Sequence, residues 1–177
     1  EALQNKNYNE AAEHFNYLVQ HAPKAAESIY QRGELVYANK FSRATTRPEQ
    51  KAAFDSMMIV LDLRLIHFGT TDIAKAEILD RRARQYVTYN KRDREGVRNA
   101  FKDALAAQIV AGSADLYELG VIYMQNLSDD YKNDEIYADV VISEYDRLAP
   151  YYANAPEDKK QFADQLDTVF GMSGVAT

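Results

Sequence analysis

The stretch TRPEQKAAFDSMMIVLDLRLIHFG, residues 46–69, decides the fold class. Thr46 and Glu49 have the spacing of a helix capping box, and Pro48 is tolerated in the first turn of a helix. Apolar residues then recur every three or four positions, which is the period of one buried helix face. They are Ala53, Met57, Val60, Leu61, Leu65 and Phe68. The stretch therefore predicts a helix that starts beside Thr46 and stops at Gly69 in the left-handed conformation.

The rest of the chain has the same pattern. Only 7 glycines and 4 prolines interrupt its 177 residues, and strand-type alternation does not persist anywhere. We therefore predict an all-α protein with about eight helices. The other expected helices cover about residues 8–22, 25–38, 71–89, 95–112, 113–126, 135–152 and 157–171. We expect a loop over residues 39–47, an acidic loop over 128–134, and a bend or break before Pro150.

Composition narrows the classes of function. The net charge is −6, and no long stripe of lysine and arginine is present to neutralise phosphates, which disfavours a nucleic-acid partner. The longest wholly apolar run, residues 57–61, is far shorter than the roughly 20 residues of a membrane-spanning helix. The absence of cysteine excludes disulfides and thiolate ligands. The sequence opens at Glu1 directly into helical sequence, so we expect that it is a fragment whose upstream part was removed.

Possible metal and catalytic groups are few. His14 and His21 lie seven residues apart on one expected helix with Glu10 nearby, but a metal needs three or four converging ligands. The acidic loop around Asp129 has oxygen ligands but lacks the glycine and the spacing of a calcium-binding loop. No Ser/His/Asp arrangement, phosphate loop or HExxH motif occurs. We therefore predict no catalytic residue, no metal site and no cofactor.

Short helices joined by short loops suggest an internal repeat. The first part of the chain has Ala11 and Phe15 four residues apart, followed by Pro23 and preceded by Tyr8. This spacing resembles the second helix of a tetratricopeptide repeat, whose period is about 34 residues. Gly33 falls in the same register at the start of a second unit.

The later part of the chain resembles the same family. Its matching positions are Leu116, Leu119, Gly120 and Tyr123, then Ala138, Ile142 and Pro150. The resemblance covers residues 1–38 and 113–150, and it is extended by continuity to the residues between. It implies antiparallel helical hairpins stacked into a right-handed superhelix, one domain over residues 1–177. Small residues such as Gly120 would let paired helices approach closely, while Phe15, Tyr123 and Ile142 would fill the space beside them.

A second resemblance concerns the cellular location. The segment of residues 53–69 is similar to a segment of exported cell-envelope tetratricopeptide proteins of Bacteroidetes, although Leu61 stands where those proteins have tyrosine. This similarity implies a protein that is exported to the periplasm or bound to the envelope after a signal peptide is removed. A cytoplasmic location is the alternative. The similarity implies no chemistry.

The 13 tyrosines are the one compositional excess, because tyrosine offers rigid contact area with a polar tip. The family resemblance places the first helix of each hairpin along a concave groove, with Glu77, Asp80 and Arg84 near its middle. The groove residues that it implies are Glu27, Tyr30, Glu34, Tyr37, Arg84, Tyr117, Val121, Met124 and Gln125. We expect Tyr30, Tyr37 and Tyr117 to be exposed there and to have no role in folding.

These expectations favour a non-enzymatic scaffold that binds a peptide or protein segment in its groove. The alternative is a helical domain of an envelope uptake complex that binds a glycan or small molecule, with tyrosines stacked on sugar faces. An enzyme is the third possibility. Retention by protein partners would favour the scaffold, and retention by polysaccharide would favour the alternative.

Overall fold

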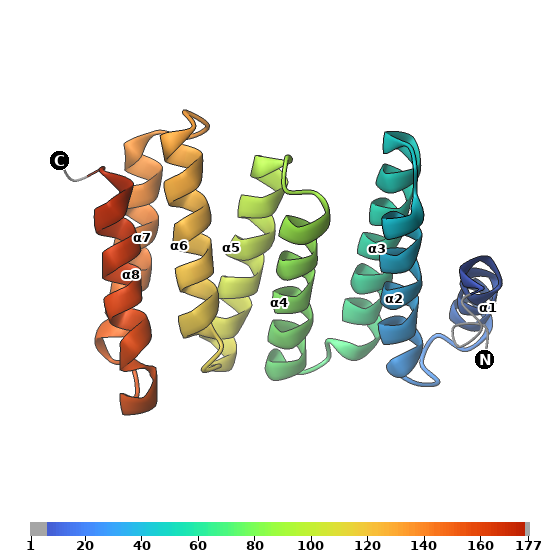
Figure 1. Cartoon of the computed structure of the whole chain (residues 1–177). Coiled ribbons are helices and arrows are strands. Elements are labelled where there is room, and N and C mark those ends of the chain that lie inside the picture. Colours follow the sequence, from blue (N-terminus) through green and yellow to red (C-terminus); the bar gives the residue numbers. More distant parts are fainter. Residues whose placement is uncertain (1–6, 176–177) are drawn as a thin grey trace. The chain divides into compact units, whose positions relative to one another are not determined.

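A computed structural model describes residues 7–175 of the chain and shows an all-α protein (Figure 1). Consecutive helices from α2 to α4, and from α5 to α8, run antiparallel to one another. The helices are α1 (Tyr8–His21), α2 (Ser28–Arg43), α3 (Arg47–Phe68), α4 (Asp72–Tyr89), α5 (Arg94–Ala111), α6 (Leu116–Lys132), α7 (Ala138–Ala153), the 3₁₀ turn η1 (Glu157–Lys159) and α8 (Lys160–Ser173). The prediction of an all-helical protein with about eight helices is confirmed. None of the helices within residues 7–175 is both long and apolar enough to cross a membrane.

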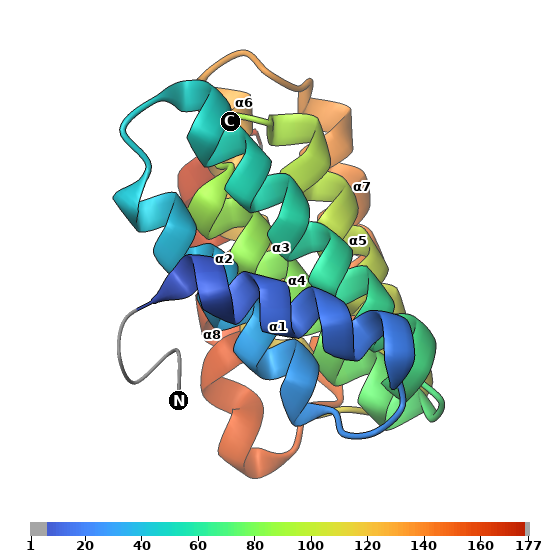
Figure 2. The ribbon, with the colours of Figure 1, turned by 90° about the vertical axis from the view of Figure 1, so that its right-hand side faces the viewer.

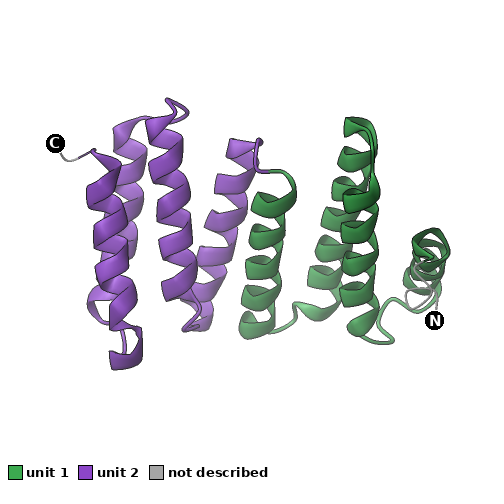
Figure 3. Cartoon of the chain, in the orientation of Figure 1, with its two compact units in different colours: residues 1–90 green, residues 91–177 purple. Residues whose placement is uncertain are grey.

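The chain forms two compact units, Glu1–Asn90 and Lys91–Thr177 (Figure 3). In unit 1, α2 packs against α1 on one side and α3 on the other, and α3 packs against α4. Helix α1 crosses α2 at a steep inclination. Figure 1 shows α1 nearly end-on, and Figure 2 shows it lengthwise. In unit 2, α6 is the central helix and contacts α5, α7 and α8.

The core of unit 1 is partly aromatic. The ring of Phe15 lies edge-on to the rings of Tyr30 and Tyr37, at centroid distances of 6.1 and 6.2 Å. Phe54 contacts Tyr86 in the same edge-on manner at 5.0 Å. In unit 2, the fully buried large side chains are Phe101, Leu105, Leu119, Tyr123, Met124, Leu127, Leu148 and Leu166.

Two glycines permit the close helix contacts that the sequence predicts. A Cβ atom on Gly33 of α2 would lie 2.4 Å from the ring of Phe15 on α1. A Cβ atom on Gly120 of α6 would lie 2.1 Å from the hydroxyl oxygen of Tyr152 on α7. Both glycines therefore provide space for an aromatic side chain of the neighbouring helix. Ile142, which was expected to fill such a space, is instead 38% exposed, and Val141 is the buried residue of that turn.

The start and the end of α3 lie where the sequence predicts them, but the conformation of Gly69 differs from the prediction. The Thr46 hydroxyl accepts from the Glu49 amide at 3.3 Å, and the Glu49 carboxylate accepts from the Thr46 amide at 3.1 Å, which completes the capping box. Gly69 has φ −79° and is therefore not in the left-handed region. The left-handed glycines at helix ends are Gly112 after α5, with φ 63°, and Gly174 after α8, with φ 83°.

Two helices run further than predicted, and a third has no break at its proline. Helix α2 continues to Arg43, because Phe41 packs edge-on against Tyr89 of α4 at 5.0 Å. Helix α6 includes most of the expected acidic loop, because Asp130 is buried against arginines of α5. Helix α7 passes through Pro150. A proline there is tolerated because it stands in the last turn and removes the donor of only one backbone hydrogen bond.

Candidate binding cavity in unit 1

A cavity of about 610 Å³ opens where α1, α2 and α3 meet. Its volume lies within the roughly 300–1,000 Å³ typical of small-ligand pockets, and it can hold a few side chains of a peptide. Residues from the start of α1, the end of α2 and the start of α3 surround it. They are Asn7, Tyr8, Asn9, Tyr37, Lys40, Arg43, Ala44, Thr45, Glu49, Ala52, Ala53 and Ser56.

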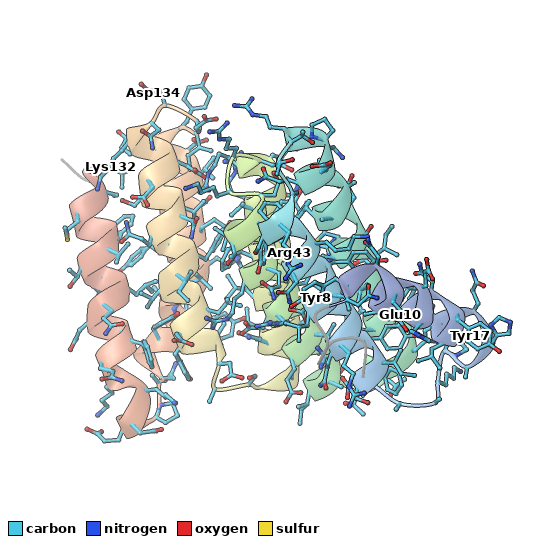
Figure 4. The ribbon with its side chains drawn as sticks, turned by 45° about the vertical axis from the view of Figure 1, so that its right-hand side comes forward. Tyr8, Glu10, Tyr17, Arg43, Lys132 and Asp134 are labelled. Carbon is cyan, nitrogen blue, oxygen red and sulfur yellow. The ribbon has the colours of Figure 1, made fainter. Side chains whose placement is uncertain are left out.

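The last turns of α2 supply the charge of this cavity. Tyr37, Lys40 and Arg43 follow one another at three-residue spacing, which places them on one helix face. The Lys40 ammonium lies 5.9 Å from the centroid of the Tyr37 ring, and the Arg43 guanidinium lies 4.6 Å from that of Tyr8 on α1. Figure 4 shows Tyr8 and Arg43 together where α1 meets α2. Within residues 7–175, neither cation has a carboxylate partner within 4 Å.

The start of α3 supplies the only carboxylate that lines the described part of the cavity, and this group is already engaged. Glu49 accepts hydrogen bonds from the backbone amides of Thr45 and Thr46, both at 3.1 Å. These amides lower the pKa of Glu49, so that it stays ionised at neutral pH. Two cations thus face one carboxylate that is bound to the backbone, and the lining carries a positive excess.

Burial keeps Tyr37 neutral, since removal from water raises the pKa of its phenol. The cavity therefore offers two cations, two phenolic rings and several neutral amides and hydroxyls. Such a set can hold an anionic or polar group by charge and hydrogen bonding. Residues 7–175 include no group of three or more His, Asp or Glu side chains arranged to hold a metal ion.

Among the predicted groove residues in unit 1, the prediction for Tyr30 is wrong, because Tyr30 is not exposed. Its side chain is fully buried, and its hydroxyl donates to the carbonyl of Pro23 at 2.8 Å. It lies in the centre of the α1–α2–α3 contact, with Phe68 edge-on at 5.7 Å. A residue with no accessible surface cannot touch a partner, so Tyr30 has a role in folding. Tyr37 is half-buried and lines the cavity.

The predicted acidic groove residues of unit 1 form ion pairs between helices. Glu27, the N-cap residue of α2, pairs with Arg64 of α3 at 2.8 Å. Glu34 of α2 is buried and pairs with Arg81 of α4 at 2.7 Å, while the Gln85 amide also donates to it. These carboxylates therefore join α2 to its neighbours.

Arg84 pairs with Asp80 one turn earlier on α4, at 2.5 Å. Asp62 of α3 pairs with Arg82 of α4 at 2.8 Å. The Asp62–Arg82 pair adds to the polar network that joins the helices of unit 1, whereas the Asp80–Arg84 pair lies within α4.

The remaining predicted groove residues belong to unit 2, on α6. Met124 is fully buried, so its assignment to a binding surface is also wrong. Tyr117 is half-buried and lies edge-on to Tyr152 at 5.4 Å, and Val121 is half-buried. Gln125 is exposed, and its amide donates to Asp129 at 2.9 Å. A partner could therefore reach Gln125 and the exposed parts of Tyr117 and Val121.

The groups that were weighed as metal ligands have other contacts. His14 lies 3.5 Å from the Glu10 carboxylate, and His21 contacts the carbonyl oxygen of Tyr17 at 2.8 Å through Nδ1. Figure 4 shows Glu10 and Tyr17 along α1. In the expected acidic loop, Asp130 is buried and pairs with Arg94 and Arg98. Figure 4 shows Lys132 and Asp134 at the end of α6. These side chains do not converge on one point.

The cavity was not predicted from the sequence. Lys40 and Arg43 both fall in the polar loop predicted over residues 39–47, and Tyr8 is predicted only as a position of the repeat. The stripe of Tyr37, Lys40 and Arg43 at three-residue spacing was a usable signal, but it required the longer α2 that the structure shows. The contribution of α1 to the cavity depends on the inclination of that helix and has no signal in the sequence.

No protein-family model matches the chain, and no curated protein or solved structure gives a significant match.

Proposed function

We propose that this protein is a non-catalytic binding module that holds a segment of another protein, and that the cavity of unit 1 is its binding site. The observation that carries the proposal is the pair of cations, Lys40 and Arg43, that line an open cavity without a described carboxylate partner. Such unpaired charge contributes little to folding and is suited to a ligand. The small residues that set close helix contacts, Gly33 and Gly120, are what a tetratricopeptide-like scaffold would need, and we propose that architecture with it.

The arrangement of the rings favours a polypeptide over a glycan. Sugars bind tyrosine by stacking on an open ring face, yet the Tyr8 ring already carries the Arg43 guanidinium and the Tyr37 ring lies near Lys40. Peptides use charge, backbone hydrogen bonds and side-chain contacts, all of which the lining offers. A glycan ligand is therefore the alternative outcome of the experiment below.

The test is selection of binding peptides from a random library displayed on phage, followed by affinity measurement with the intact chain. Ala52 is exposed and lines the cavity, so Ala52→Trp should fill the opening and weaken the selected peptides by at least roughly tenfold. Ala106→Trp, at an exposed position of α5 outside the lining, is the matched control and should leave affinity unchanged.

Two outcomes would contradict the proposal. Selected peptides that bind Ala52→Trp and the unaltered chain equally would show that the cavity is not their site. Failure to enrich any peptide, together with retention on polysaccharide that Ala52→Trp abolishes, would assign the cavity to a glycan.

A further inference from the structure

The geometry points to a more specific ligand, and this inference rests on the proposed function: the cavity of unit 1 binds the carboxylate of an acidic side chain in a polypeptide segment, held between Arg43 and Lys40. Each element of that statement comes from the contacts of the two cations and from the charge of the whole chain.

The contact of Arg43 with Tyr8 leaves its hydrogen-bonding edge without a partner among residues 7–175. A guanidinium that stacks on a ring uses its flat face, whereas its five N–H donors point outward in the plane of the group. The guanidinium carbon lies 4.6 Å from the ring centroid, and no described residue accepts a hydrogen bond from Arg43. The ring therefore restrains the side chain at a position that lines the cavity. A carboxylate fits this edge with two parallel hydrogen bonds.

Lys40 supplies the second contact. It stands one helical turn before Arg43 on α2, so that both charged groups reach the same side of the helix. Its ammonium lies over the edge of the cavity near Tyr37, and it too lacks a carboxylate partner within residues 7–175. Because Glu49 is the one carboxylate of the lining, one further negative charge balances the described lining. This balance fits a single carboxylate better than a dianion.

The net charge of the whole chain disfavours acidic ligands, so the preference for a carboxylate belongs to the cavity alone. With a net charge of −6, the protein repels acidic peptides at long range. Binding of such a peptide therefore requires a particular place where positive charge is unpaired. Five other cations of unit 1 are paired with carboxylates: Lys51, Arg64, Arg81, Arg82 and Arg84. Of the described cations of unit 1 that are not in such pairs, Lys40 and Arg43 are the two that line the cavity.

The experiment uses synthetic hexaglutamate as the probe, with hexaglutamine as its neutral analogue and inorganic phosphate as a second anion. Isothermal titration calorimetry with the intact chain should show binding of hexaglutamate, little or no binding of hexaglutamine, and weakening as salt is raised. Lys40→Gln and Arg43→Gln should each weaken hexaglutamate roughly tenfold or more, because each removes a charge-assisted contact. Arg32→Gln, at an exposed position of α2 outside the cavity, should have no effect.

The results separate this inference from the proposed function. Library peptides that Ala52→Trp blocks, combined with equal binding of hexaglutamine and hexaglutamate, would overturn the carboxylate site and leave the peptide site standing. Unchanged hexaglutamate affinity in both glutamine variants would also overturn it. Displacement of hexaglutamate by equimolar phosphate would show that the site does not select a carboxylate, which again contradicts the inference. If neither hexaglutamate nor any library peptide binds, both proposals fail.

Discussion

Replacement of Gly120 by alanine tests the close contact between α6 and α7. The added Cβ atom would lie 2.1 Å from the Tyr152 hydroxyl oxygen and 3.1 Å from the ring carbon that carries it. That hydroxyl donates to the carbonyl of Tyr117 at 2.6 Å, with the carbonyl of Leu116 at 3.2 Å. The ring of Tyr152 must therefore move, and its hydrogen bonds are lost as it does so.

Three contributions set the expected size of the effect. Overpacking of a helix contact costs about 1–3 kcal/mol. Loss of the Tyr152 hydrogen bonds costs about 1 kcal/mol, and the better helix propensity of alanine over glycine returns about 1 kcal/mol. Gly120→Ala should therefore lower the free energy of unfolding by about 1–3 kcal/mol.

The decisive comparison uses Tyr152→Phe as a second background. Without the hydroxyl, the nearest atom to the new Cβ is the ring carbon at 3.1 Å, and a shift of a few tenths of an ångström accommodates it. Gly120→Ala should then be neutral or stabilise by up to about 1 kcal/mol. Urea unfolding, followed by circular dichroism at 222 nm on all four proteins, measures both effects. Equal destabilisation in the two backgrounds would refute the reasoning, because the clash would not involve the hydroxyl.

Three further predictions concern side chains that the structure places in defined contacts. Tyr30→Ala should lower the free energy of unfolding by about 3–5 kcal/mol, since Tyr30 is fully buried, and an unchanged urea midpoint would contradict its place in the core. Asp130→Asn should cost roughly 3 kcal/mol in the same assay because two arginines lose their shared carboxylate, whereas a loss below about 0.5 kcal/mol would show that the ion pairs are not formed. The hydrogen bond to Asp167, with burial, raises the pKa of Tyr145 to about 12, so its contribution to stability is complete below the unfolded pKa of about 10 and is lost as pH rises through about 12. Absorbance at 295 nm should show that titration, and Asp167→Asn should move it toward pH 10; an unmoved curve would contradict the cause.

The sequence predicted the helix starts well where the signal comes from residues within one helical turn of each other. The Thr46–Glu49 capping box is complete in the structure, and the helices that start at about residues 8, 47 and 72 begin within a residue or two of their predicted positions. Capping depends on residues three positions apart, and helix periodicity depends on residues three and four apart. Both are visible in a single sequence.

The errors arise where contacts between distant residues decide the outcome. Residues 128–134 read as an acidic loop because their charge is typical of solvent, but Asp130 is neutralised by Arg94 and Arg98 from another helix. With that charge paired, Leu127 and Ser128 can face inward and α6 continues. Tyrosine occurs on surfaces and in cores, so its residue type did not reveal that Tyr30 is buried. The carbonyl of Pro23, which accepts the hydrogen bond of its hydroxyl, lies seven residues earlier in the sequence.

The candidate site likewise has a part that the sequence predicts and a part that depends on contacts between helices. Tyr37 was singled out from its position in the expected repeat, and it does line the cavity. Tyr8, Lys40 and Arg43 could not be assigned to a site from the sequence. Their roles depend on how α1 crosses the end of α2, which brings the Tyr8 ring against Arg43, 35 positions later in the sequence. A repeat register predicts which helix face is shared, but not how far each helix is tilted.

The contact between Phe15 and Gly33 also limits how the first two helices can move. The ring occupies the one position on this face of α2 where no side chain stands, with Ile29 and Tyr37 one turn to either side. Sliding α1 along α2 by one turn, about 5.4 Å, would drive the ring into one of those side chains. Translation of the two helices is thus blocked in both directions. The contact therefore fixes the register of α1 on α2, and with it the position of Tyr8 beside the last turn of α2.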